Sequence, residues 1–244
     1  MAKAPPDGYT LLLSADSFYL GPLLRDDAPY DPVRDFSPIT LVVNSPSILV
    51  VHASVPANSV KELIVLAKAK QGELNYSTAA AGSSSHTAAE LFKSMAGINM
   101  VHVPYKGTAA ANTALISGEV QLTFSTFPPV APHLKAGRLR ALAVTSLQPS
   151  ALSPQLPTVA ASGLPGYESG TITGVLVPAK TPKAVIYRLN AEIVRILNTT
   201  EIRERFLNAG SEIVAGTPRQ FADTIKQDMT TMGKVIKDAG IREQ

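Results

Sequence analysis

Short apolar runs of strand length alternate along this chain with segments of helical periodicity, and that alternation limits the folds available to it. In Ser59–Lys70 the apolar residues recur at the spacing i, i+3, i+4, i+7 that is typical of an amphipathic helix. Strand-length runs occur at Tyr9–Ser14, Ile39–Val43, Ile48–Val51, Met100–Val103, Val120–Phe124, Leu139–Val144 and Gly174–Val177. Strands and helices in alternation predict an α/β fold with crossover connections, and the buried character of the strands favours mostly parallel pairing.

Composition and charge narrow the possible functions. The 244 residues suffice for one large or two modest domains, and 45% hydrophobic against 17% charged residues predicts a globular core. A net charge of +3, spread along the chain, gives no reason to expect a nucleic-acid partner. Cysteine is absent and no two of the four histidines have helical ligand spacing, so we expect no metal and no cofactor. No run of about 18 apolar residues occurs, and we expect no direct membrane insertion.

The last quarter of the chain changes character. Its periodicity predicts consecutive helices over Pro182–Asn198, Thr200–Ala209 and Thr217–Ala239. Thr217 followed by Gln220 is a capping-box pattern at the start of the third helix. Between residues 146 and 167, four prolines interrupt every period, which predicts an ordered irregular connection or a linker. We expect the chain to cross between domains there.

The segment from Asn75 to His86 is rich in small and hydroxyl-bearing residues and runs directly into a predicted helix. Small residues let a ligand approach the backbone, and a helix N-terminus offers unpaired N–H groups and the positive end of its dipole. We therefore predict an anion site for a carboxylate or a phosphate. Its residues are Ala81, Gly82, Ser83, Ser84 and Ser85. The alternative is that one serine merely caps the helix and the others are solvated.

Further hydroxyl groups follow predicted strands. Ser125 and Thr126 come directly after the strand Val120–Phe124, and Ser14 ends the first strand. Ligands of α/β sheets bind outside the carboxyl ends of the strands, so we expect these hydroxyls to share a rim with the 81–85 turn. The alternative for each hydroxyl taken singly is an ordinary turn residue.

Known nucleotide and nucleophile motifs are absent. The sequence contains neither GxxxxGK[ST] nor GxGxxG after a strand, and it has no GxSxG elbow. The rival from another functional class is a serine hydrolase that uses Ser84 or Ser85 with His86. Adjacent residues at a helix start point in different directions, which argues against this pairing. A phosphate-binding module is the third possibility.

Several motifs occur in a distinctive order: PPDGYTLL, YDP with DF, AAAGSSSH, VHVPYKG, AGRLRALAVTS and PTVAASGLPGYE. In this order, over essentially the whole chain, they resemble the Bug-type extracytoplasmic solute receptors of tripartite tricarboxylate transporters. The resemblance implies a two-lobed, periplasmic-binding-protein-like α/β fold that closes on a small organic acid and performs no chemistry. It also implies a periplasmic location and partnership with the membrane components of a tripartite transporter.

Under this resemblance, we expect lobe one to comprise residues 1–45 and 172–244, and lobe two residues 46–171. The alternative is a single compact α/β domain. Ser14, Ser125 and Thr171 would face the 81–85 turn across the interlobe cleft. Relatives often carry Asp where this sequence has Ser125, and an aromatic pair in place of Thr171-Ile172-Thr173, so the walls around the far end of the ligand differ here.

Members of the family normally begin with an export signal, a first strand and a glycine-rich loop, and this sequence starts after those features. We therefore expect lobe one to be incomplete at its N-terminus, with no signal peptide in this chain and with apolar surface exposed around Leu11–Leu13. We also expect at least tenfold weaker acid binding than in a version restored upstream.

Overall fold

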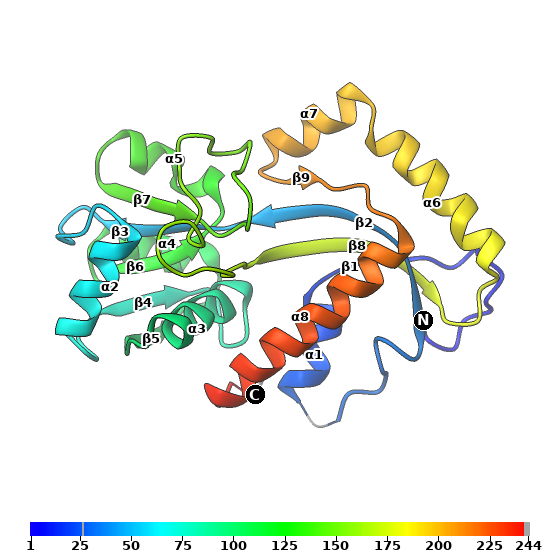
Figure 1. Ribbon diagram of the computed structural model, residues 1–244, viewed down its shortest axis with the longest axis horizontal. Helices are drawn as coiled ribbons and strands as arrows, with labels where there is room; N and C mark the ends of the chain where they lie inside the picture. Colours follow the sequence, from blue (N-terminus) through cyan, green and yellow to red (C-terminus); the bar gives the residue numbers. More distant parts are fainter. Residues whose placement is uncertain (26, 242–244) are drawn as a thin grey trace. The chain divides into compact units, whose positions relative to one another are not determined.

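The computed structural model describes residues 1–25 and 27–241, which form two compact units (Figure 1). Unit 1 comprises Met1–Ser45 and the chain from Thr171 onward, and unit 2 comprises Pro46–Gly170. Each unit has its own β-sheet with helices packed on it, so the predicted α/β fold is confirmed. Within the described ranges, no helix combines the length and the apolarity needed to cross a bilayer.

Unit 1 is built on a four-stranded sheet in the order β1-β8-β2-β9. The strands are β1 (Leu12–Ala15), β8 (Gly170–Pro178), β2 (Phe36–Pro46) and β9 (Glu212–Ile213). The helices are α1 (Ser17–Leu24), α6 (Lys183–Leu197), α7 (Thr200–Asn208) and α8 (Pro218–Asp238). β1 pairs antiparallel with β8, and β9 pairs antiparallel with β2. Helices α6 and α7 cover an apolar cluster that includes Val42, Val175 and Ile186.

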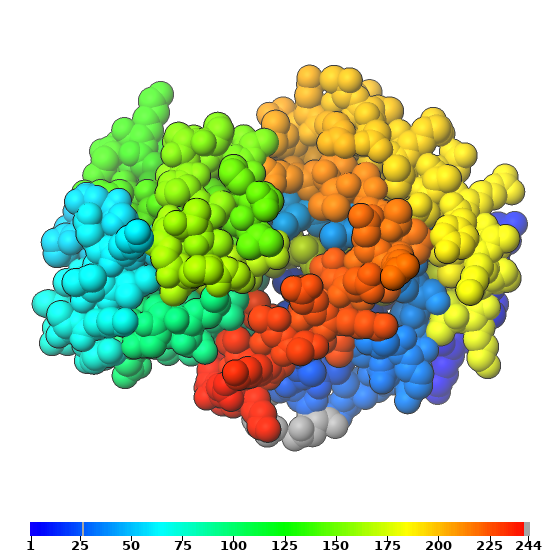
Figure 2. Space-filling model, in the orientation of Figure 1, coloured from blue at the N-terminus to red at the C-terminus, as the bar shows by residue number. Residues whose placement is uncertain are grey.

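Helix α8 packs on the sheet of unit 1 and on α1. Phe221 of α8 lies so close to Gly174 of β8 that a Cβ added there would be 2.2 Å from the ring. Tyr19 of α1 donates a hydrogen bond to Asp228 of α8 at 2.7 Å. In the space-filling view, α8 lies in front of the N-terminal residues of the same unit (Figure 2). At the sheet edge formed by β1, the side chain of Leu13 is 65% exposed.

Unit 2 is built on a five-stranded sheet in the order β5-β4-β6-β3-β7. The strands are β3 (Ile48–His52), β4 (Asn75–Thr78), β5 (Val101–Pro104), β6 (Leu122–Ser125) and β7 (Leu139–Val144). The helices are α2 (Val60–Ala69), α3 (Ser84–Ala96), α4 (Thr108–Ile116) and α5 (Phe127–Lys135). β4 is parallel to β5 and β6, whereas β3 is antiparallel to β6 and β7.

The prediction of mostly parallel pairing is wrong for unit 1 and for β3, because an apolar run reports burial of a strand and not its direction. The pattern also did not predict β4 and α5, for other reasons. β4 has the polar sequence NYST, and α5 contains three prolines. Two of these, Pro128 and Pro129, lie in the first turn of the helix, where an N–H has no intrahelical partner and its loss costs little.

The proline-rich segment between residues 146 and 167 is ordered and belongs to unit 2. Its end is anchored by Tyr167, which is fully buried and packs near Phe92 and Phe124. The Tyr167 hydroxyl donates to the carbonyl of Ala88 in α3 at 2.9 Å. The segment is therefore an irregular part of the unit's core and is held against α3.

Candidate anion-binding site

Three parallel strands of unit 2 end at one edge of its sheet, and a helix follows each of them. β4 leads into α3, β5 into α4, and β6 into α5. The parallel pairing of β4 with β5 and β6 places their carboxyl ends together. At the same edge β3 begins, and its Ile48 pairs with Ser125 at the end of β6. Three helix N-termini, with the positive ends of their dipoles, therefore gather at this edge, which favours an anion.

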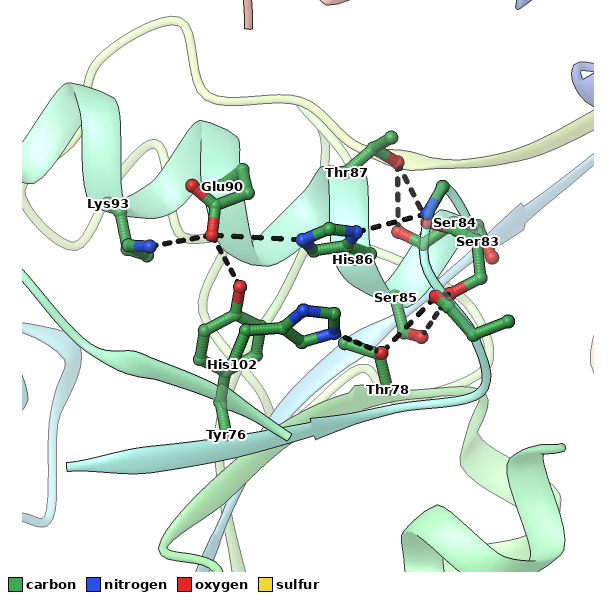
Figure 3. Close-up of polar contacts among 12 residues, drawn as sticks. Tyr76, Thr78, Ser83, Ser84, Ser85, His86, Thr87, Glu90, Lys93 and His102 are labelled. Carbon is green, nitrogen blue, oxygen red and sulfur yellow. Dashed lines mark hydrogen bonds and ion pairs between the residues drawn. The ribbon is translucent and has the colours of Figure 1, made fainter. Parts of the chain in front are cut away.

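The loop between β4 and α3 is tied to itself by its own serines (Figure 3). The Ser83 hydroxyl donates to the carbonyl of Ala80 at 2.7 Å, and the Ser85 hydroxyl accepts the N–H of Ala79 at 3.2 Å. The two hydroxyls also contact each other at 3.0 Å. Gly82 has a positive φ of 75°, which a side chain would strain. The hydroxyl groups of Ser83 and Ser85 therefore shape the loop and leave backbone groups to meet a ligand.

Four backbone N–H groups of this loop are free to bind an anion. In the described structure, the N–H groups of Ala80, Ala81, Ser84 and Ser85 make no hydrogen bond within the chain. Ala80 and Ala81 are exposed, whereas Ser84 and Ser85 are half-buried in the first turn of α3. Such donors at a helix N-terminus match the two oxygens of a carboxylate or the oxygens of a phosphate.

Two histidines lie directly behind the loop, and Figure 3 shows their rings face to face. The imidazoles of His86 and His102 stack with centroids 3.8 Å apart and planes 13° apart. His86 Nδ1 accepts the N–H of Gly82 at 3.0 Å, and His102 Nε2 lies 2.6 Å from Thr78 Oγ1. Burial lowers the pKa of His86 to about 4, and burial also lowers the pKa of His102. Both rings are therefore neutral near pH 7.

A buried carboxylate anchors the same cluster deeper in the unit. Glu90 of α3 accepts a hydrogen bond from the hydroxyl of Tyr76 and another from Lys93 Nζ, the latter at 2.6 Å. Burial and the contact with Glu90 raise the pKa of Tyr76, which keeps its hydroxyl protonated as a donor. His86 Nε2 lies 3.9 Å from Glu90 Oε1, which is beyond hydrogen-bond distance. Because Lys93 pairs with it, Glu90 presents little net negative charge to the loop.

The other predicted site residues fall into two groups. Ser125 and Thr126 lie with the 81–85 turn at the carboxyl edge of unit 2. Ser125 is 3% exposed, and its hydroxyl has no partner among the described residues, while Thr126 is exposed at the N-cap of α5. Ser14 and Thr171 lie in β1 and β8 of unit 1, both half-buried.

The structure does not bring the two unit 1 residues to one face of their sheet. Ser14 pairs with Gly174, so these two residues share a face. Thr171 is an odd number of positions before Gly174 in β8, and side chains of a strand alternate between faces. The side chains of Ser14 and Thr171 therefore point to opposite faces.

Sequence reasoning missed the cluster behind the loop. Residues Tyr76, Thr78, Glu90, Lys93 and His102 were not predicted to contribute, and their separation along the chain gives no local motif. The available signal was the His in VHVPYKG, which the pairing of Tyr76 with His102 brings beside the loop. Among the described contacts, none joins His86 to a serine hydroxyl, as a hydrolase would need. The described His, Asp and Glu side chains also form no group of three that could hold a metal.

Residues 1–241 match the family described as "Tripartite tricarboxylate transporter family receptor". Protein BugT of Bordetella pertussis is 33% identical over 243 residues, which cover 99% of this chain and 74% of BugT. This match confirms the predicted resemblance to Bug-type receptors.

Two solved structures extend the comparison to the fold. The solved structure of R. palustris Rpa4515 with adipate is 35% identical in sequence to this chain and has a TM-score of 0.78. The match covers 99% of this chain and 81% of Rpa4515. MatC from Rhodopseudomonas palustris with bound malate is 26% identical, with a TM-score of 0.74 over 96% of this chain and 81% of that chain. The chain therefore belongs to the tripartite tricarboxylate transporter receptor family.

Proposed function

We propose that this chain is a non-catalytic periplasmic receptor that binds a small organic carboxylate reversibly and delivers it to the membrane components of a tripartite transporter. The observation that carries the proposal is the set of four free N–H groups at Ala80, Ala81, Ser84 and Ser85. Two relatives support the ligand class, since Rpa4515 was solved with adipate and MatC with malate.

The energetics of such a site are sufficient for a receptor. Each hydrogen bond from an N–H group to a charged carboxylate contributes about 1.5–3 kcal/mol, and the dipole of α3 adds about 0.3–1 kcal/mol. Micromolar affinity corresponds to about 8 kcal/mol. A few of these bonds, together with the burial of the ligand's carbon chain, reach that value.

We further propose that the two units act as the lobes of the receptor and that each contributes residues to ligand binding. Ser125 and Thr126 would add hydroxyl contacts from unit 2, and Ser14 or Thr171 would contribute from unit 1. Since Ser14 and Thr171 point to opposite faces of their sheet, we expect only one of them to contact the acid directly. Single alanine substitutions, followed by calorimetry, identify which one.

The central test is Ser84→Asp. The new carboxylate would lie at the first residue of α3, beside the free N–H groups, and would compete with the ligand for them. We expect its affinity for adipate or malate, measured by isothermal titration calorimetry, to fall at least tenfold.

Ser94→Asp is the matched control, because Ser94 is an exposed residue near the far end of the same helix. We expect that variant to bind within about twofold of the unsubstituted protein. Unchanged affinity in Ser84→Asp would remove this loop from consideration. Formation of a product from the bound acid would contradict a non-catalytic receptor.

A further inference from the structure

We propose that His86 and His102 are positioning residues, which hold the middle and the start of the anion-binding loop through one defined ring nitrogen each. The inference rests on the proposed function, since it assigns these rings a role in carboxylate affinity without contact with the ligand. It is drawn from the contacts shown in Figure 3.

The first contact holds the middle of the loop. Gly82 N–H donates to His86 Nδ1 at 3.0 Å. Because His86 is neutral and accepts at Nδ1, its proton lies on Nε2. The bond fixes Gly82 directly between the free N–H groups of Ala81 and Ser84. The positions of those donors therefore depend on an acceptor at His86 Nδ1, in addition to the bonds that Ser83 and Ser85 make within the loop.

The second contact holds the start of the loop. The hydroxyl of Thr78, the last residue of β4, donates to the carbonyl of Ala80 at 3.2 Å. A hydroxyl has one proton, so its 2.6 Å contact with His102 requires a proton on Nε2 of that ring. His102 thus acts as a donor where His86 acts as an acceptor, and it fixes Ala80 through Thr78.

The rings themselves are held from behind. His86 stacks on His102, and the ring of Tyr76 lies beside both, with its centroid 5.2 Å from that of His102 and 6.4 Å from that of His86. Tyr76 is fixed in turn by Glu90, which Lys93 also binds. Tyr76, Glu90 and Lys93 are charged or titratable neighbours of the pair, and the packing of Tyr76 against both rings supports their orientation toward the loop.

Asn and Gln variants can show whether each histidine acts through one defined ring nitrogen or only by filling space behind the loop. The amide oxygen of Asn takes a position close to that of Nδ1 of His, whereas the amide group of Gln reaches the position of Nε2. His86→Asn and His102→Gln therefore keep the required groups, and His86→Gln and His102→Asn displace them. We expect the first pair to bind adipate or malate within about threefold of the unsubstituted protein, and the second pair to lose at least tenfold.

Equal affinity across the four variants, or losses that follow side-chain volume alone, would overturn the positioning role. Should a variant fail to fold, two-bond ¹H–¹⁵N spectra of the unsubstituted protein decide the matter. They are expected to show both rings protonated at Nε2, and a proton on Nδ1 of His86 would refute the proposal. Ser84→Asp separates the two hypotheses, because unchanged affinity in that variant refutes the loop as the site whatever the histidine variants do.

Discussion

The pKa of Asp16 provides a test of how burial of a carboxyl group affects the stability of unit 1. Asp16 is the N-cap of α1, and its carboxylate accepts the N–H of Ser17 at 3.0 Å. Burial, with a further contribution from Asp228, raises its pKa from 3.8 to about 7. Asn at this position keeps an oxygen for the cap and removes the charge, so we expect Asp16→Asn to stabilise the protein above pH 7.

The sign and the size of the effect follow from proton linkage. A carboxyl whose pKa is raised in the folded state contributes full stability below pH 3.8 and loses it progressively as the pH rises to about 7. Each pH unit over that interval lowers the free energy of unfolding by about 1.4 kcal/mol. The largest gain that removal of the charge could give is therefore about 4 kcal/mol. The side chain of Asp16 is only half-buried, so solvent screening reduces the expected gain to about 2 kcal/mol.

Thermal unfolding at pH 4 and pH 8 measures this gain. About 2 kcal/mol corresponds to a rise in Tm of about 4–8 °C at pH 8 for a chain of this size, with little change at pH 4. Asp35→Asn is the control, because Arg34 lowers the pKa of Asp35 from 3.8 to about 2. The Asp35 carboxylate therefore stabilises the fold fully above pH 3.8, and its removal should lower Tm at both pH 4 and pH 8. The same Tm difference at both pH values for Asp16→Asn would refute the reasoning.

Two further substitutions test packing and capping. Gly174→Ala should destabilise unit 1 by at least about 1–3 kcal/mol in urea unfolding, because the new Cβ would be 2.2 Å from Phe221 and 2.8 Å from the Thr40 carbonyl. Gly233 lies in α8, where an added Cβ would make only an ordinary 3.6 Å contact with Leu23, so Gly233→Ala should instead stabilise the protein by up to about 1 kcal/mol. Equal changes in stability for the two glycine variants would contradict the close packing of Phe221 on Gly174. Thr217→Ala should cost about 1 kcal/mol through loss of the capping box, and Thr217→Ser should restore most of it.

The sequence predicts elements well where periodicity and capping agree. The apolar run Leu139–Val144 predicts β7 with the bounds that the structure has, and the capping box of Thr217 with Gln220 is present. As expected, the segment Ala81–Ser85 leads from a strand into a helix: Ala81–Ser83 follow β4, and Ser84 and Ser85 begin α3. These features depend on neighbours in the chain, and local patterns therefore carry enough information to predict them.

Other features depend on pairing between distant segments, which no local pattern encodes. His102 reaches the loop because β5 pairs in parallel with β4, opposite Tyr76. Glu90 would be expected on a solvated helix face, yet it is buried because Tyr76 and Lys93 satisfy it. The antiparallel pairing in unit 1 was missed for the same reason, since burial of a strand does not reveal its direction.

The bond from Tyr167 to Ala88 has a consequence for how mutational data on this protein should be interpreted. It attaches the proline-rich segment to α3 one turn after the first residue of that helix, although the two residues are 79 positions apart in sequence. In a scan scored by ligand uptake, substitutions at Tyr167 should therefore appear among the most damaging. Their effect would be that of a loosened support under the loop, and assigning Tyr167 to the ligand-contacting residues from such a score would be an error.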